Sequence, residues 1–406
     1  MLTPHQALPA RSNGVWLHIL AGLCASLVSI GLARFAYTPL LPSLIEAHWF
    51  STADVIYLSA ANLIGYLIGA LVGRPIASRL SNGNTLRAMM LLATASFFAC
   101  AYPLSITWFF GWRLLSGIAG GVIMVLVAAT VIPHVPAARK GLASGAIFIG
   151  VGLGIAGSGT LVPFLLSLGL RDAWIGLGLV ALALTAVSWF GWPSANATAA
   201  ASANAAAEHH GKPGPLHRGV YLLFGQYALM AVGLVPSMVF LVDYVTRELG
   251  LSAHAGAVIW VMYGIGAILG PVVYGFLADR LGARTSIRLV LAVQAVAVAL
   301  LCSTSQFALL AVLAVVIGSF PPGIVPLALG RIHELEPRHD QQQVAWSRAT
   351  VSFATFQALA GYAYSVIFNA SGGHHVMLFV IAASAIVVAL LADFAAGLLS
   401  QARRQH

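Results

Sequence analysis

Charged side chains are scarce in this chain. Of its 406 residues only 8% are Asp, Glu, Lys or Arg, whereas 60% are hydrophobic. Soluble domains contain about 25% charged residues, so the composition excludes a water-soluble fold. Long apolar segments cross a bilayer as helices, because every backbone polar group must be satisfied inside the segment. The scarcity of charge therefore predicts an all-α membrane protein.

Cysteine and metal-ligand clusters are also nearly absent. The three cysteines all fall inside apolar runs, with no metal-ligand spacing and no disulfide framework: Cys24, Cys100 and Cys302. The pairs His209–His210 and His374–His375 are expected in loops without further ligands, so we predict no metal site.

No constellation of catalytic residues stands out either. The chain lacks a phosphate-cradling loop of the Walker type, which argues against ATP as energy source, and we expect no buried His to serve as a base. The sequence thus predicts neither an enzyme nor a cofactor. The net charge of +9 does not require nucleic acid as partner, because positive charge also collects on the cytoplasmic loops of membrane proteins.

Twelve apolar runs account for nearly all of the chain. We expect two six-helix halves joined by a polar linker rich in Ala, Ser, Asn, Gly and Pro. The predicted order is a cytoplasmic tail at 1–14, the first half at 15–192, the cytoplasmic linker at 193–218, the second half at 219–399 and a cytoplasmic tail at 400–406.

Lys and Arg in the loops predict the orientation. With the N-terminus inside, fifteen of the 20 Lys and Arg residues lie on the cytoplasmic side, and only Arg171 and Arg247 lie outside. Both termini are therefore expected in the cytoplasm. The other three, Arg34, Arg113 and Arg348, fall within spans.

The two halves repeat each other weakly at an offset of 201 positions. Gly65, Gly69, Gly117, Ala77 and Arg79 correspond at this offset to Gly266, Gly270, Gly318, Ala278 and Arg280. Such a parallel repeat is typical of transporters with a binding site between two halves.

A charged turn between the eighth and ninth runs resembles a known signature. The segment Gly275-Phe-Leu-Ala-Asp279-Arg280-Leu-Gly282-Ala-Arg284 resembles the signature loop of the major facilitator superfamily, with one insertion before its last Arg. Arg113, followed by Gly117, resembles the fourth-span motif of that superfamily. The segment from Arg34 to Pro42 looks like its bacterial YbfB-like branch.

This resemblance implies a monomeric, multi-pass transporter in the bacterial inner membrane. It would work by alternating access, the two halves rocking about a central cavity. The resemblance also implies that Asp279 acts as a latch by pairing with cytoplasmic arginines and the first turn of the fifth span. The implied latch residues are Gly275, Asp279, Arg280, Gly282, Arg284, Arg79 and Arg139.

Two arginines are expected deep in the membrane. Arg34 lies about ten residues from the outer end of its span, roughly 15 Å, which is too deep for the side chain to reach the surface. Arg113 is expected at a similar depth. No Asp or Glu falls clearly in mid-span, so an anionic substrate is the expected partner of these cations. The alternative for both residues is a structural role, in which they bind backbone carbonyls.

Other polar groups in mid-span are candidates for the same cavity. Tyr37 follows Arg34 by three residues and shares its helix face. The remaining candidates either contact substrate or bond helix to helix: Asn62, Gln226, Tyr227, Tyr263, Gln294 and Gln357.

The sequence therefore favours a transporter of a small organic anion, with membrane lipid around it. Proton symport stays open, with Glu46, Asp243 or the substrate itself as the proton carrier. Two alternatives remain. One is efflux of drug-like or aromatic compounds, and the other is a sensor or partner subunit that transports nothing.

Overall fold

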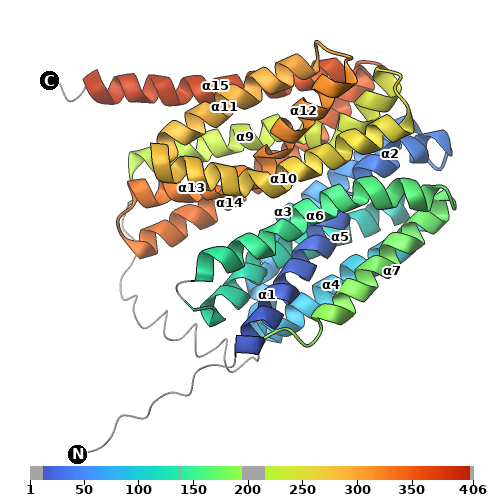
Figure 1. Ribbon diagram of the computed structural model, residues 1–406, viewed down its shortest axis with the longest axis horizontal. Coiled ribbons are helices and arrows are strands. Elements are labelled where there is room, and N and C mark those ends of the chain that lie inside the picture. Colours follow the sequence, from blue (N-terminus) through green and yellow to red (C-terminus); the bar gives the residue numbers. More distant parts are fainter. Residues whose placement is uncertain (1–11, 137–138, 194–214, 403–406) are drawn as a thin grey trace, which may run out of the picture.

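The chain folds entirely into helices where the structure describes it. The computed structural model describes residues 12–136, 139–193 and 215–402, and no strand occurs within these ranges (Figure 1). The predicted N-terminal tail to residue 11 and most of the predicted linker lie outside the described residues. The helices at the two chain ends exceed the predicted spans by a few residues, because helical backbone bonding continues past the apolar segment: α1 begins at Ser12 and α15 ends at Ala402.

Six membrane-crossing segments form each half. The first half contains α1 (Ser12–Ser26) with η1 (Leu27–Leu32) and α2 (Tyr37–Glu46), α3 (Thr52–Leu80), α4 (Asn82–Cys100), α5 (Ile106–Val131) with η2 (Ile132–His134), α6 (Lys140–Leu166) and α7 (Leu170–Ser188). The second half contains α9 (Arg218–Asp243) with η4 (Tyr244–Glu248), α10 (Ala253–Leu281), α11 (Ala283–Leu301), α12 (Phe307–Gly318) with α13 (Phe320–Leu335), α14 (His339–Ala370) and α15 (His375–Ala402). Among the described residues, eleven of these segments are long and apolar enough to cross a membrane, and α4 completes the predicted twelve. The predicted all-α membrane fold is confirmed.

The first span is broken in its middle. The π-helix η1 ends at Leu32, four turn residues follow, and α2 begins at Tyr37. Two prolines on the far side of the break, Pro39 and Pro42, lack the N–H that a continuous helix would donate backwards. The break therefore places Arg34 in a turn at the centre of the protein, where backbone groups are available to side chains.

Close glycine contacts confirm the internal repeat. A Cβ on Gly65 of α3 would lie 2.1 Å from the carbonyl oxygen of Leu114 on α5, and one on the equivalent Gly266 of α10 would lie 2.0 Å from that of Val315 on α12. Only a residue without a side chain permits backbones to approach this closely. Each half thus has a tightly packed helix pair at the same place in its fold.

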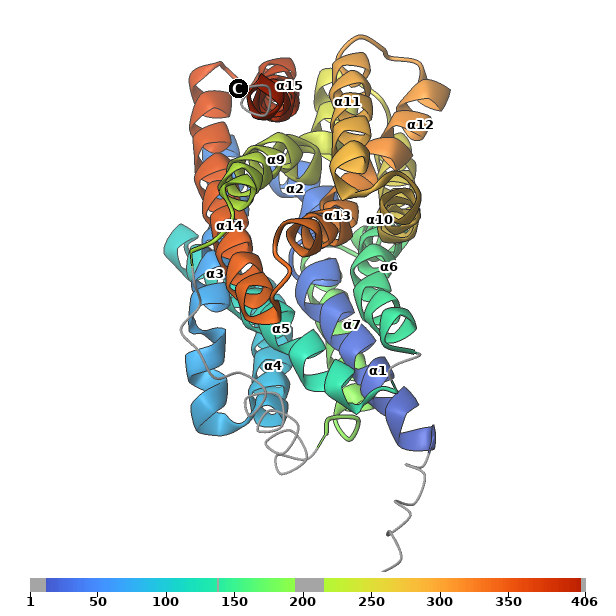
Figure 2. The same cartoon turned by 90° about the vertical axis from the view of Figure 1, so that its left-hand side faces the viewer.

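The halves contact each other toward one end of the molecule. We call the end that holds Ser12 and Ala402 the terminal end, and the opposite end the far end (Figures 1 and 2). The hydrogen bonds between the halves, among the described residues, all lie from the middle to the far end: Arg34–Gln357, Thr38–Met238, Ser158–Trp260 and Ile56–Ser365. Within the same ranges, no hydrogen bond ties the halves together at the terminal end.

The glycine contacts give a stability prediction. Gly65→Ala and Gly266→Ala should each destabilise the protein by about 1–3 kcal/mol, because the new methyl group forces the helices of a pair apart. Thermal unfolding of the purified protein measures the effect. Gly111→Ala on α5 is the matched control, since a Cβ there meets no heavy atom within 4 Å. Equal midpoints for all three variants would contradict the close approach.

Candidate functional site

Arg34 lies between the two halves. Its Nε donates to Oδ1 of Asn62 on α3 at 3.3 Å, and its Nη1 donates to Oε1 of Gln357 on α14 at 3.2 Å. The guanidinium also lies over the ring of Tyr66, 4.2 Å from its centroid. Two neutral amides and an aromatic face therefore hold this cation, and one of the amides comes from the opposite half.

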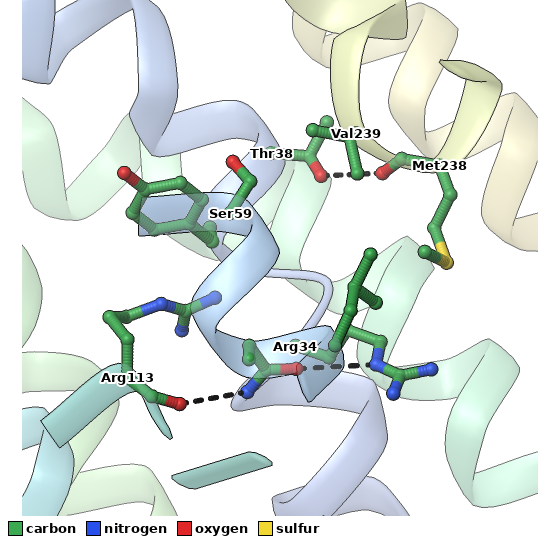
Figure 3. A pocket seen from close by; sticks show the side chains of 9 residues that line it. Arg34, Thr38, Ser59, Arg113, Met238 and Val239 are labelled. Carbon is green, nitrogen blue, oxygen red and sulfur yellow. Dashed lines mark hydrogen bonds between the residues drawn. The ribbon is translucent and has the colours of Figure 1, made fainter. Parts of the chain in front are cut away.

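The Asn62 amide joins Arg34 to Arg113, because its Nδ2 donates to the Arg113 carbonyl at 3.5 Å while its Oδ1 accepts from Arg34 (Figure 3). Only 4% of Arg113 is exposed. Its Nη1 donates to the carbonyl of Ala33 at 2.7 Å, in the broken part of the first span, and its guanidinium lies 4.3 Å from the centroid of Tyr37. Arg113 therefore binds a backbone carbonyl, as expected if its role were structural.

Neither arginine has a carboxylate partner among the described residues, whose salt bridges all lie elsewhere. Each arginine also keeps one buried nitrogen without a hydrogen bond, namely Nη2 of Arg34 and Nε of Arg113. A buried charge without a counter-charge is costly in a protein, and an unpaired buried donor adds to that cost. An oxygen acceptor that carries a negative charge would satisfy these donors and offset the charge.

A small cavity lies between these groups. Its volume is about 10 Å³, room for roughly one water molecule. Residues of the first half form most of the lining and two residues of α9 close it: Arg34, Tyr37, Thr38, Ser59, Asn62, Leu63, Arg113, Met238 and Val239 (Figure 3). The Tyr37 hydroxyl donates to the Val55 carbonyl at 2.8 Å, so the ring of Tyr37 is fixed beneath Arg113.

Aromatic side chains lie beside the break in the first span. Phe35 packs against Trp260 of α10 with 6.2 Å between ring centroids, and Trp260 stacks on Tyr263 at 4.9 Å and 7°. The Trp260 indole donates to Ser158 of α6, which fixes this stack across the interface of the halves. The Trp260–Tyr263 stack of the second half therefore packs against Phe35, the residue that follows Arg34.

Three of the predicted site residues make their contacts within the second half, away from the cavity: Gln226, Tyr227 and Gln294, whose Nε2 donates to the Val316 carbonyl at 2.7 Å. Gln226 donates to the Ala389 carbonyl at 3.2 Å and so bonds α9 to α15. Tyr227 packs against Phe353, 4.6 Å between ring centroids, within the second half. Like Asn62 and Gln357, they are polar residues in mid-span. Their side chains, however, contact neighbouring helices of the second half and not the cavity.

Tyr66, whose ring lies beneath the Arg34 guanidinium, was not among the predicted site residues. Its position offered a signal, because Tyr66 follows Asn62 by four residues and so shares its helix face. Ser116 was missed in the same way. Its hydroxyl accepts from Nδ2 of Asn62 at 2.9 Å and orients the Asn62 amide toward Arg34.

The five predicted latch residues between Gly275 and Arg284 lie at the terminal end of the second half. Asp279 is exposed and has no ion pair in the part of the chain that the structure describes. Arg280 lies over the ring of Phe276, and the Arg284 Nε contacts Asp393 of α15 at 3.2 Å. The implied pairing of Asp279 with arginines is therefore not made in this conformation.

The turn itself has the predicted form. Gly282 has a φ of +78° and, as the only residue between α10 and α11, lets one helix end and the next begin. Its counterpart 201 positions earlier, Ser81, adopts a φ of +71° between α3 and α4. Arg79 lies exposed beside that counterpart, and Arg139 lies exposed before α6.

Comparisons with known proteins agree with this architecture. The family described as "Uncharacterised MFS-type transporter YbfB" matches residues 26–394. A relative from Pseudomonas putida named "Gallate transporter" is 27% identical over 274 residues, which is 59% of this chain and 60% of the relative's length. The chain thus matches about three fifths of that protein.

Solved transporters share the fold. A structure of the xylose transporter XylE from E. coli, in a partially occluded inward open conformation, superimposes with a TM-score of 0.71 at 14% identity, covering 93% of this chain and 98% of that one. The nucleoside transporter NupG superimposes with a TM-score of 0.72 at 15% identity, covering 93% and 99%. With these structures as neighbours and a family match over most of its length, the chain belongs to the major facilitator superfamily, as a transporter of the YbfB type.

Proposed function

We propose that this transporter moves a small organic anion across the bacterial inner membrane by alternating access. The observation that carries the proposal is the pair Arg34 and Arg113, two cations inside the helix bundle that each keep a buried donor without a hydrogen bond and have no carboxylate partner among the described residues. Ionisable groups inside a membrane protein typically mark a substrate pathway. A bound carboxylate would satisfy the free donors and offset the buried charge.

Aromatic carboxylates are the first candidates within this class. Trp260 stacks on Tyr263 and packs against Phe35, the residue after Arg34, so aromatic side chains lie next to the broken segment that holds this arginine. The relative named "Gallate transporter" also supports an aromatic carboxylate as substrate, since gallate has a carboxylate on a hydroxylated benzene ring. The cavity of about 10 Å³ holds no such molecule as it stands, so entry of substrate requires the helices around it to separate.

The contacts between the halves support an assignment of the conformation. With the terminal end in the cytoplasm, the interface is closed on the outer side and lacks hydrogen bonds on the inner side among the described residues. We assign this structure to an inward-facing state. Uptake of an anion against an inside-negative potential costs about 2.3 kcal/mol per charge per 100 mV, so proton cotransport is part of the proposal.

The anion site is tested with gallate as the probe. Arg34→Ala and Arg113→Ala should each weaken gallate binding by about 10–100-fold, because a charge-assisted hydrogen bond is worth about 1.5–3 kcal/mol. The rise in thermal midpoint on adding gallate to the purified protein reports the affinity.

Arg171→Ala is the matched control for this test. Arg171 also lies over a tyrosine ring, that of Tyr102, but is exposed at the far end, so its loss should leave the gallate shift unchanged. If cationic or neutral aromatic compounds stabilise the wild type and both site variants equally, efflux of such compounds replaces the proposal. Gallate binding without flux in proteoliposomes would favour a sensor.

Gln357 allows a test in which a negative charge is added beside Arg34 and no cation is removed. Gln357→Glu places a carboxylate about 3.2 Å from Arg34 without changing side-chain size, so the protein supplies its own anion. We expect the thermal midpoint without ligand to be kept or raised, and the gallate shift to be lost.

The neutral variant Gln357→Leu separates the effect of the added charge from the effect of losing the amide hydrogen bond. It removes the hydrogen bond but adds no anion, so it should retain part of the gallate shift. Equal loss of the shift in both variants would mean that the amide hydrogen bond matters and the introduced charge does not.

Asp279 is tested for a role in closing the cytoplasmic side. Asp279→Asn should slow gallate flux while leaving gallate affinity unchanged, because the residue lies far from the cavity and acts only when the inner side is closed. Flux in proteoliposomes and thermal shift measure the two quantities. Asp172→Asn at the far end is the matched control, since Asp172 is likewise an exposed carboxylate near a helix terminus. Unchanged flux in Asp279→Asn would refute the latch.

A further inference from the structure

The imidazole of His375 lies between two carboxylates at the far end of the second half. Its Nε2 is 2.6 Å from Oδ2 of Asp243, and its Nδ1 is 2.6 Å from Oε2 of Glu248. The sequence analysis placed His375 in a loop and expected no buried histidine. Both expectations are wrong, because α15 begins at this residue and turns its side chain inward, leaving His374 exposed.

The surroundings of this imidazole are closed to water on most sides. Asp243 is fully buried, and the rings of Phe240, Tyr244 and Phe368 lie 6.3, 6.0 and 4.8 Å from the His375 ring. The Glu248 side chain is 26% exposed and so connects the cluster with the medium.

The other ionisable groups near the cluster are few. From η4, Arg247 contacts Asp243 at 3.3 Å, and the Tyr244 hydroxyl donates to the Leu301 carbonyl at the end of α11. The thiol of Cys302 lies within electrostatic reach of Tyr244 and Glu248. From α14, within the described residues, an aromatic ring and no charged group packs against the imidazole. The two carboxylates sit at opposite nitrogens of the ring, so they do not converge on a common metal ion.

The two short contacts require two protons. A neutral imidazole carries one N–H, so it can donate to only one of the carboxylates. Both contacts at 2.6 Å exist together only if the imidazole is protonated, or if one carboxylate is. With Arg247 included, the protonated cluster is electrically neutral. Removal of one proton would bring two lone pairs face to face and leave a net negative charge in a buried place, so one contact must break.

We propose that Asp243, His375 and Glu248 form a proton-binding site, and that a bound proton holds the far end of α9 and η4 against α15. The Glu248 carboxylate reinforces this connection, because it also accepts the backbone N–H of His375 at the start of α15. Loss of the proton frees the η4 segment from α15.

The same stretch of α9 reaches the anion cavity. Met238, five residues before Asp243, lines the cavity, and its carbonyl accepts from Thr38 of the first half at 2.8 Å. Movement of the far end of α9 would therefore disturb the Thr38–Met238 hydrogen bond, which joins the two halves beside the cavity. In this way proton release would favour opening of the far end, a coupling that rests on the proposed anion transport.

Proton binding itself is tested without substrate. Thermal midpoints of the purified wild type, His375→Gln and His374→Gln are measured between about pH 5 and pH 9, the range in which histidine sites titrate. Because the folded state holds a proton that the unfolded chain releases, the wild-type midpoint should fall as pH rises, by about 2–5 °C. His374→Gln should follow the wild type, and His375→Gln should lack this fall.

A second variant, Asp243→Asn, distinguishes loss of the proton site from loss of folding. Asp243→Asn can donate its amide N–H to Nε2 of a neutral imidazole, so it should keep a high midpoint that no longer depends on pH. If His375→Gln and Asp243→Asn both retain the wild-type pH dependence, the proton site is refuted.

Coupling is tested separately in proteoliposomes with gallate. Because proton release is proposed to open the far end, gallate exchange by the wild type and by His374→Gln should depend on the pH of the outer solution. His375→Gln should lose this dependence and retain gallate exchange. An unchanged dependence on outer pH in His375→Gln would overturn the coupling. Absence of gallate uptake in the wild type would refute the proposed substrate, while the thermal measurements would still decide the proton site.

Discussion

The central constraint on this fold is the presence of two guanidinium groups inside a membrane protein with no carboxylate to neutralise them among the described residues. Arg34 and Arg113 are accommodated by neutral partners, namely two amides, one backbone carbonyl and the faces of two tyrosines. These interactions hold the cations in place but leave their charge uncompensated. The helix break, the polar groups around it and the joint between the halves all follow from keeping these cations at the centre.

The helices pack closely both within each half and between the halves. Inside each half, glycine contacts such as those of Gly65 and Gly266 bring backbones to distances that no side chain permits. Across the interface the approach is as close, since a Cβ on Gly264 of α10 would lie 2.3 Å from the backbone nitrogen of Ala156 on α6. Hydrogen bonds between the halves are few among the described residues, and one of them joins Arg34 to Gln357. Where two halves move against each other, such interface contacts are the ones that must be exchanged.

Charge is divided unequally between the halves. The first half supplies both arginines of the central site, and the second half supplies several buried carboxylates, Asp243 among them, and the buried imidazole of His375. α9 connects the two regions, because Met238 lines the cavity and Asp243 follows on the same helix. The pseudo-symmetric backbone thus carries an asymmetric distribution of ionisable groups.

The sequence by itself determined the membrane class, the twelve segments, the repeat and the mid-span position of Arg34 and Arg113 along the chain, since each depends on local hydropathy or on spacing along one helix. Tertiary structure decided which neighbour each polar residue meets. Gln226 and Gln357 have the same mid-span pattern, yet one bonds to Ala389 and the other to Arg34. The partner of Arg284 is Asp393, and His375 lies between two carboxylates, across separations of more than 100 residues. Periodicity fixes the face of a helix that a side chain occupies, but the packing of the helices decides what lies opposite that face.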